Sequence, residues 1–208
     1  MAAHSPASTN SRNGKKSDEF PKLIIENCEP SLSPWLLAEY RHSAKIWPNL
    51  IFCNVADNEM RRRLSAFSTV VTTDAQQYTG GKGCIILDHQ AKTPLTTSDF
   101  SRASYIIVGG ILGYDRPLGR TSKLITSRFS KIKNFPRHMG KKQLSIDSAV
   151  FVARAIMLGS RLEDIEVTQE VEIKWDGTHS SILPYGYPVV DGNLILTPGL
   201  MKILRETP

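Results

Sequence analysis

The stretch YIIVGGILG, from Tyr105 to Gly113, is the part of the sequence that indicates the fold. Its first half is a short continuous apolar run, which is typical of a strand buried on both faces of a parallel sheet. Its second half, Gly109–Gly113, has three glycines within five residues, so the main chain can approach a ligand closely. It matches neither G-x-G-x-x-G nor a Walker loop, because the spacing differs and no Gly-Lys-Ser follows. Alone, it fits a tight structural turn as well as a ligand loop.

Working outward, further short apolar runs repeat this pattern, and segments with helical periodicity separate them. The predicted strands are Lys22–Glu26, Leu50–Asn54, Cys84–Asp88 and the weaker Lys131–Phe135. The predicted helices are Ser33–Trp47, with Ser33 as N-cap and Pro34 in the first turn, and Asn58–Phe67. This alternation predicts an α/β fold: a mostly parallel sheet with helices on both faces and ligands at the carboxyl ends of the strands.

The segment MGKKQLS, Met139–Ser145, connects the last predicted strand to a predicted helix. Ser145 can cap that helix, Asp147 in its first turn suits the helix dipole, and Gly159 ends it. The amides of this loop and of the helix start would suit the polar edge of a purine or an anion. A well-capped connection with no ligand explains the segment equally well.

The two ends of the chain differ from its centre. Residues 1–20 are rich in Ser, Asn and Lys and are predicted to be a disordered tail, which leaves 21–208 as one domain. Residues 160–208 are predicted to be a small C-terminal extension. Its expected elements are a strand at Ile165–Lys174, a hairpin at Val189–Ile195 and a final helix opened by Thr197-Pro198.

The net charge of +6 is unevenly distributed over the 208 residues. The stretch Arg116–Lys142 holds nine Lys or Arg and no Asp or Glu, so it carries +9 and the rest of the chain carries −3. A basic patch on a slightly acidic body indicates a polyanionic partner, and a solvated charged face is the equally weighted alternative.

Several classes of protein are not supported by the composition. The three cysteines are odd in number and widely spaced, so we expect neither a disulfide framework nor a metal site. We expect the protein in a reducing compartment, the cytoplasm. No apolar run reaches the length needed to cross a bilayer, and no signal peptide opens the sequence, so no membrane partner is expected.

Taken together, ILD, YIIVGGILGYDRPLGRTSKL and MGKKQLSIDSAVFVARAI resemble the SPOUT superfamily of S-adenosylmethionine (SAM)-dependent methyltransferases. Within it, the chain is similar to the family that includes a fungal arginine methyltransferase acting on a small-subunit ribosomal protein and archaeal RNA methyltransferases. The resemblance covers about Lys22 to Ile165, including EPSLSPWLLAEY. It implies a C-terminal trefoil knot, which spacing alone would not suggest because threaded chains are rare.

The resemblance also implies which residues bind SAM, mainly through the main chain of three loops. These residues are Leu87, Asp88, Gly109, Gly110, Ile111, Leu112, Gly113, Met139, Gly140, Gln143, Leu144 and Ser145. Gly140 and Leu144 would lie near the adenine, and Gly110 and Gly113 along the ribose and methionine.

Two departures from the family pattern touch the expected catalytic surface. Tyr114 stands where the family has an acidic residue, with Asp115 one place later, and Asp88-His89-Gln90-Ala91 replaces Asp-Pro-Arg-Ala. For an arginine acceptor, a carboxylate must orient the guanidinium and receive its proton. Asp115 is our first candidate for this catalytic carboxylate and Asp88 is the second.

Three functions stay open from the sequence: a protein arginine methyltransferase acting on a ribosomal protein, a SAM-dependent methyltransferase acting on rRNA or tRNA, and a non-catalytic ribosome- or RNA-binding protein. In the first two, ribosomal protein or ribosomal RNA is the partner. The residues expected to contact the substrate or RNA are Arg116, Arg120, Lys123, Arg137 and Lys141. The resemblance favours a monomer, with a homodimer as the alternative.

Overall fold

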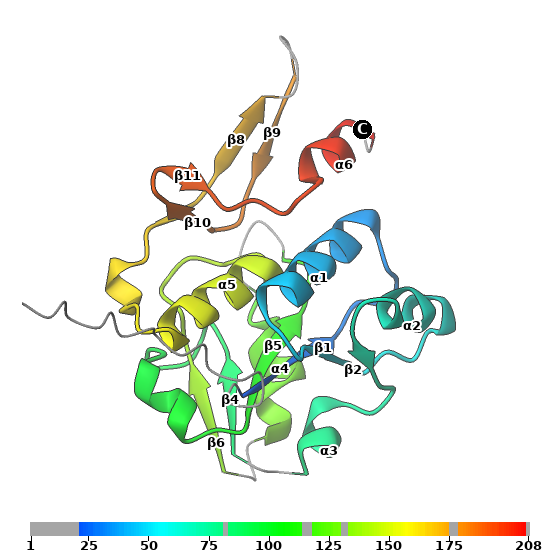
Figure 1. Cartoon of the computed structure of the whole chain (residues 1–208), viewed down its shortest axis with the longest axis vertical. Coiled ribbons are helices and arrows are strands. Elements are labelled where there is room, and N and C mark those ends of the chain that lie inside the picture. The colour runs from blue at the N-terminus through cyan, green and yellow to red at the C-terminus, as the bar shows by residue number, and fades with distance from the viewer. Residues whose placement is uncertain (1–20, 81–82, 114–117, 130–132, 175–178, 207–208) are drawn as a thin grey trace, which may run out of the picture.

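The computed structural model describes residues 21–80, 83–113, 118–129, 133–174 and 179–206. Its centre is a six-stranded sheet in the order β3-β2-β1-β5-β4-β6 (Figure 1). The strands are β1 (Lys22–Asn27), β2 (Ile51–Cys53), β3 (Thr69–Val70), β4 (Cys84–Leu87), β5 (Tyr105–Gly110) and β6 (Asn134–Arg137). All pairings in this sheet are parallel, as predicted. The longest register joins β1 and β5 from Lys22↔Tyr105 to Asn27↔Gly110.

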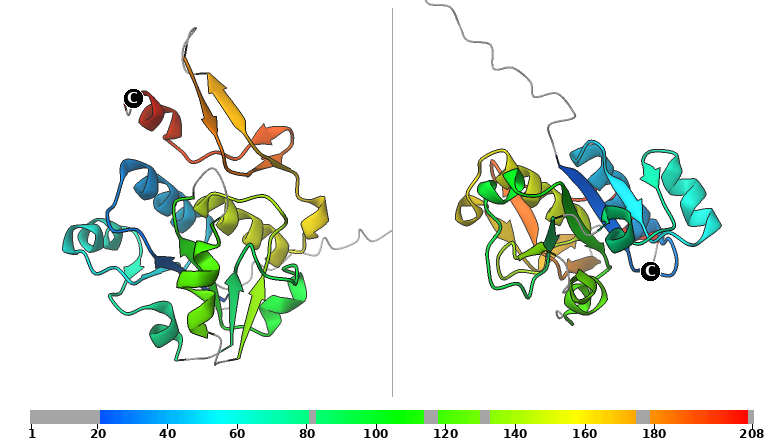
Figure 2. Two further views of the ribbon diagram at one scale, coloured as in Figure 1. Left: turned by 180° about the vertical axis from the view of Figure 1, so that it is seen from behind. Right: turned by 90° about the horizontal axis from the view of Figure 1, so that it is seen from below.

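Helices cover both faces of this sheet, which confirms the predicted layering (Figure 2). The helices are α1 (Pro34–Ile46), α2 (Asn58–Ser65), α3 (Ala75–Thr79), α4 (Arg120–Leu124), α5 (Ile146–Met157) and α6 (Leu200–Glu206), with short 3-10 turns η2 (Thr97–Ser101), η3 (Thr126–Phe129) and η4 (Leu162–Asp164). Successive strand residues point to opposite faces. Leu23 and Ile25 therefore pack with α1, α2 and α5, whereas Ile24 packs in the second core with residues of α3 and η3.

Two carboxylates connect this sheet to its surroundings. Glu26 of β1 is fully buried; its side chain accepts a hydrogen bond from the Ala75 amide at the start of α3 (2.8 Å) and pairs with Arg128. Burial, opposed by the Arg128 hydrogen bond, raises the pKa of Glu26. Asp99 in η2 accepts a hydrogen bond from Arg137 of β6 at 2.7 Å. Both contacts join segments that are far apart in the sequence.

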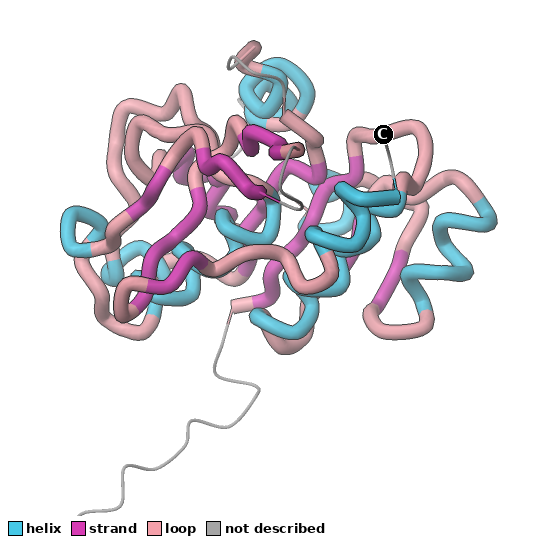
Figure 3. The backbone as a smooth tube through the Cα atoms, turned by 90° about the horizontal axis from the view of Figure 1, so that it is seen from above, coloured by secondary structure: helices cyan, strands magenta, loops and turns pink. Residues whose placement is uncertain are grey.

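Residues beyond α5 form two small antiparallel sheets that lie over α1 and α5, away from the central sheet (Figures 1 and 3). Their strands are β7 (Val167–Thr168), β8 (Val171–Lys174), β9 (Ser180–Leu183), β10 (Tyr187–Val190) and β11 (Asn193–Leu194). The predicted hairpin is present as β10 and β11. Asp191 and Gly192 form its turn with positive φ angles of 50° and 74°.

Three boundaries differ from the prediction. The strand expected at Lys131–Phe135 is present as Asn134–Arg137, and residues 131–132 of the expected range lie outside the described residues. It continues through Pro136, which an edge strand tolerates. The strand expected at Ile165–Lys174 is broken by Glu170, whose φ of 58° turns the chain, so β7 pairs with β10 and β8 with β9. The last helix begins at Leu200 rather than Thr197, after Gly199 at φ 84°.

Among the described residues, no helix is long and apolar enough to cross a bilayer. The predicted tail, residues 1–20, lies outside the described ranges, as do Asp115 and Arg116.

Candidate functional site

Three loops that follow neighbouring strands meet at one edge of the central sheet. We call them the β4 loop (residues 88–96), the β5 loop (the described residues 111–113 and 118–119) and the β6 loop (residues 138–145). Because β5, β4 and β6 are adjacent and parallel, their carboxyl ends point the same way. This is where open α/β sheets bind ligands.

A cleft lies between these loops. Its volume is about 130 Å³, and it opens to solvent. Ten of the residues predicted to bind the cofactor line it: Leu87, Asp88, Gly109, Ile111, Gly113, Met139, Gly140, Gln143, Leu144 and Ser145. The structure thus brings together three loops that the sequence analysis had predicted, one by one, to bind the cofactor.

Gly110 and Leu112, which were also predicted to bind the cofactor, are not among the residues that line this cleft. A Cβ on Gly110 would lie 2.3 Å from the Tyr40 hydroxyl, on the side of the buried core. Leu112 packs against the core, and its amide donates to the Glu29 carboxylate at 3.0 Å. Both residues therefore fix the course of the β5 loop from behind.

Gly113 is where the main chain comes closest to its neighbours. A Cβ there would lie 1.9 Å from Nε2 of Gln143 and 2.7 Å from a ring carbon of Tyr185. Real side-chain atoms do not approach this closely, so any larger residue would require the Gln143 side chain and the Tyr185 ring to move.

Asp88 sits in the cleft wall and is almost completely buried. Its Oδ1 accepts a hydrogen bond from the Gln90 amide at 2.9 Å, and its Oδ2 accepts one from the Thr126 hydroxyl at 2.6 Å. These two bonds fix the orientation of the carboxylate. Asp115, the first catalytic candidate, lies outside the described residues.

The basic residues of the predicted substrate surface divide into two groups. Arg120 pairs with Glu29 at 3.1 Å and lines the cleft, and Arg137 pairs with Asp99. Lys123 and Lys141, in contrast, are exposed. The sequence showed the charge of the arginines, but not the distant carboxylates that pair with them.

Sequence reasoning missed several cleft residues, which are Val108, Leu118, Gly119, Thr121, Lys142, Ile146 and Ala149. His89 and Gln90, already noted as departures from the family pattern, also line the cleft. Val108 and Ile146 are ordinary apolar residues of a strand and a helix, and no local pattern separates them from the core. His89 and Gln90 directly follow Asp88, so their place in the loop was available as a signal.

A second cleft, of about 590 Å³, lies beside the first. Met139, Gly140, Lys142 and Leu144 line both clefts, so the β6 loop forms the wall between them. On the other side of the second cleft are the β4 loop, from Pro94, and residues 160–165.

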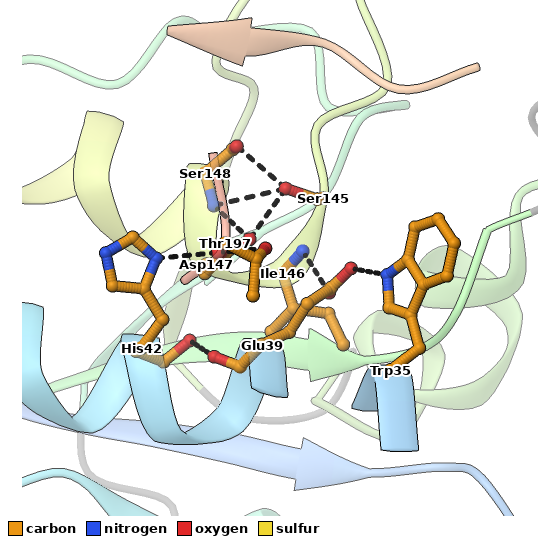
Figure 4. A network of polar contacts seen from close by, with 9 residues as sticks. Trp35, Glu39, His42, Ser145, Ile146, Asp147, Ser148 and Thr197 are labelled. Carbon is orange, nitrogen blue, oxygen red and sulfur yellow. Dashed lines mark hydrogen bonds and ion pairs between the residues drawn. The ribbon is translucent and has the colours of Figure 1, made fainter. Parts of the chain in front are cut away.

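A buried polar network supports the start of α5 from behind (Figure 4). Glu39 of α1 accepts hydrogen bonds from the Trp35 indole at 2.6 Å and from the Ile146 amide at 3.0 Å. Asp147 contacts His42 Nδ1 at 2.7 Å and accepts from the Thr197 hydroxyl at 2.6 Å. Ser145 caps α5, as predicted. The network therefore joins α1, α5 and the C-terminal extension directly beneath the β6 loop.

Burial, with the nearby Asp147 carboxylate as second cause, raises the pKa of Glu39 to about 8. Between about pH 4.5 and pH 8 the folded protein then holds a proton here that the unfolded chain has released. The free energy of unfolding should therefore decrease as the pH rises through this window, on the order of 1 kcal/mol per pH unit at this site.

This dependence can be measured by urea unfolding at pH 5 and pH 8.5 in the parent protein and in Glu39→Gln, which cannot titrate. We expect a smaller decrease between the two pH values in the variant. An equal decrease in both proteins would show that another group is responsible.

The residues of the first cleft suit an adenosine-type cofactor. Apolar side chains such as Leu87, Met139 and Leu144 can contact the faces of a purine, and main-chain groups around Gly113 and Gly140 can contact its polar edges. Arg120 lines the same cleft, where its guanidinium is paired with Glu29. The start of α5, capped by Ser145, also borders the cleft.

A parallel sheet with this loop cradle at the ends of β4, β5 and β6 has the architecture of the SPOUT superfamily of SAM-dependent methyltransferases. The chain belongs to the family described as "Protein arginine N-methyltransferase SFM1-like", whose profile matches residues 22–207.

Individual relatives agree with this assignment. The protein arginine N-methyltransferase SFM1 of Saccharomyces cerevisiae is 26% identical over 204 residues, which cover 89% of this chain and 94% of the relative. The crystal structure of yeast SFM1 complexed with SAH superimposes with a TM-score of 0.79 at 25% identity, covering 88% of this chain and 94% of that chain. Trm10 of Thermococcus kodakaraensis shares the fold, with a TM-score of 0.53 at 15% identity, covering 69% and 96%. This protein is therefore a SAM-dependent methyltransferase.

Proposed function

We propose that this protein transfers the methyl group of SAM to an arginine side chain of a ribosomal protein. The observation that carries the proposal is the match of nearly the whole described chain to a family of protein arginine methyltransferases, together with a cleft whose loops fit SAM. When bound, SAM supplies an electrophilic methyl group on a sulfonium. The protein needs chiefly to align a guanidine nitrogen with it, and such alignment can contribute roughly 7–11 kcal/mol.

Loss of a proton from the acceptor is the second requirement. With a guanidinium pKa near 12.5–13.8, forming the neutral guanidine at pH 7 costs about 8–9 kcal/mol. A carboxylate that orients the guanidinium and accepts the proton as the C–N bond forms removes part of this barrier. Asp88 lies in the cleft wall with its orientation fixed. Asp115, which lies outside the described residues, stays our first candidate for this role.

The ion pairs of the basic stretch favour a protein acceptor over RNA. Arg120, Arg128 and Arg137 each pair with a carboxylate of the protein, so less positive charge faces outward than the sequence indicates. Lys123, Lys133, Lys141 and Lys142 remain exposed. They can contact ribosomal RNA next to the acceptor protein, with an affinity that decreases as salt increases.

These exposed lysines are also the observation that supports the alternative, a SAM-dependent RNA methyltransferase. The RNA acceptor would then be ribosomal RNA or tRNA. We propose that the protein acts in the cytoplasm as a monomer. Sedimentation of the purified protein tests the monomer, and a dimer of 46 kDa, twice the 23.2 kDa of the chain, would contradict it.

The acceptor is tested by incubating purified small ribosomal subunits with SAM that carries a tritiated methyl group. We expect label that survives nuclease, is released by protease and appears as methylarginine after acid hydrolysis. The Gly113→Val variant should incorporate less label at limiting SAM, because it binds the cofactor more weakly. Label that nuclease removes would establish the RNA alternative, and absence of label with intact SAH binding would overturn the ribosomal acceptor.

A further inference from the structure

The C-terminal extension contacts the β5 and β6 loops at several points. The Tyr185 hydroxyl donates a hydrogen bond to the carbonyl oxygen of Gly113 at 2.7 Å. The Gly186 amide donates to the carbonyl oxygen of Gln143, also at 2.7 Å, and Gly186 pairs with Leu144 in an isolated parallel bridge. Two consecutive residues of the extension thus hold the main chain of two different cofactor loops.

The fit at this junction is tight. The Tyr185 ring lies against Gly113 on one side, and a Cβ on Gly186 would lie 2.8 Å from Val167 and 3.1 Å from the Leu144 side chain. Neither Tyr185 nor Gly186 lines the cleft itself. They pack behind the residues that do, where they can set the position of those residues without touching the cofactor.

Tyr185 is also connected to the other end of the β6 loop. Its ring packs edge-on against Trp35, with ring centroids 6.5 Å apart and an interplanar angle of 89°. The Trp35 indole donates to Glu39, which in turn accepts from the Ile146 amide. A continuous set of contacts therefore runs from Gly113 in the β5 loop, through the extension and α1, to the start of α5.

We propose that Tyr185 is a positioning residue of the methyltransferase, which fixes the Gly113 carbonyl and thereby the spacing between the β5 and β6 loops across the cofactor cleft. The extension then completes the cofactor site rather than only covering the catalytic part of the chain. The proposal depends on SAM binding and is independent of whether the acceptor is protein or RNA.

The chain offers a matched control two residues away. Tyr187 is fully buried, and its hydroxyl has no hydrogen-bond partner among the described residues. Tyr185→Phe removes the hydroxyl that donates to Gly113, whereas Tyr187→Phe removes a hydroxyl that has no hydrogen-bond partner among the described residues. Both changes keep an aromatic ring in place, so neither is expected to prevent folding.

The test is calorimetric titration of the full chain with SAH, together with the thermal unfolding midpoint of each variant. We expect Tyr185→Phe to raise the dissociation constant for SAH about 3- to 10-fold, the effect of one hydrogen bond. We expect Tyr187→Phe to bind SAH like the parent protein. The thermal unfolding midpoints of the two variants should be close to each other.

Unchanged SAH affinity in Tyr185→Phe would overturn the proposal. An equal loss of affinity in both variants, in proportion to their loss of thermal stability, would also overturn it, because the effect would then be structural. Because SAH binding needs no acceptor, failure here is distinct from failure of the ribosomal-protein acceptor.

Discussion

Gly113→Val is expected to raise the dissociation constant for SAH roughly 30- to 100-fold while the protein still folds. A Cβ at this position would lie 1.9 Å from the Gln143 amide and 2.7 Å from the Tyr185 ring. The flexible Gln143 side chain can move, but the ring is held between Gly113 and Trp35. The β5 loop must then shift outward, and overpacking of this kind costs about 1–3 kcal/mol, of which each 1.4 kcal/mol is tenfold in affinity.

Calorimetric titration with SAH measures this effect, and circular dichroism checks the fold. Gly113→Ala should give a smaller effect in the same direction. Gly83→Ala is the matched control, since a Cβ on Gly83 would lie 3.4 Å from its nearest neighbour, an ordinary contact. If Gly113→Val bound SAH as tightly as Gly83→Ala, Gly113 would not belong to the cofactor site.

Arg128→Ala is expected to lower the free energy of unfolding by about 3 kcal/mol at pH 8, because removing one partner of a buried ion pair leaves an uncompensated charge. The remaining partner, Glu26, is fully buried in the central sheet. Its pKa is already raised, by burial above all, and should rise further without Arg128. At pH 5 Glu26 can bind a proton in the folded state, so the loss of stability should be smaller there.

Urea unfolding at the two pH values measures this difference. Arg62→Ala is the control, because Arg62 pairs with Glu59 on the exposed face of α2, where such pairs contribute at most about 1 kcal/mol. The double variant Glu26→Gln, Arg128→Ala should regain part of the stability at pH 8. A loss that is independent of pH, or a double variant as unstable as Arg128→Ala at pH 8, would contradict the role given to Glu26.

Much of the central sheet could be predicted because its strands carry their signal locally. Runs such as Leu23–Ile25 and Ile106–Val108 are apolar at every position, since helices cover both faces of the sheet. Short elements carried no such signal. The two residues of β3 are not buried, and α3 and α4 have five residues each, too few to show a helical period.

The candidate site was predictable to the extent that main chain forms it. Gly113 and Ser145 perform the roles their residue types indicate, a close approach and a helix cap. The trefoil knot and the division between the domain and residues 160–208 stay predictions. The ion pairs of the basic stretch could not be predicted from the sequence, because their partners are distant in it: Arg128 and Glu26 are 102 positions apart.

By itself the sequence determined the parallel α/β sheet, the two glycine-bearing loops and the capped start of α5. These features depend on residue types within a few positions of one another, and backbone geometry is local. Only the tertiary structure decided that Arg120 and Arg137 would be paired, that Glu39 would lie beneath the β6 loop, and that Tyr185 would bond to Gly113, 72 positions away. Such contacts follow from how the packed layers bring distant segments together, and no local pattern encodes them.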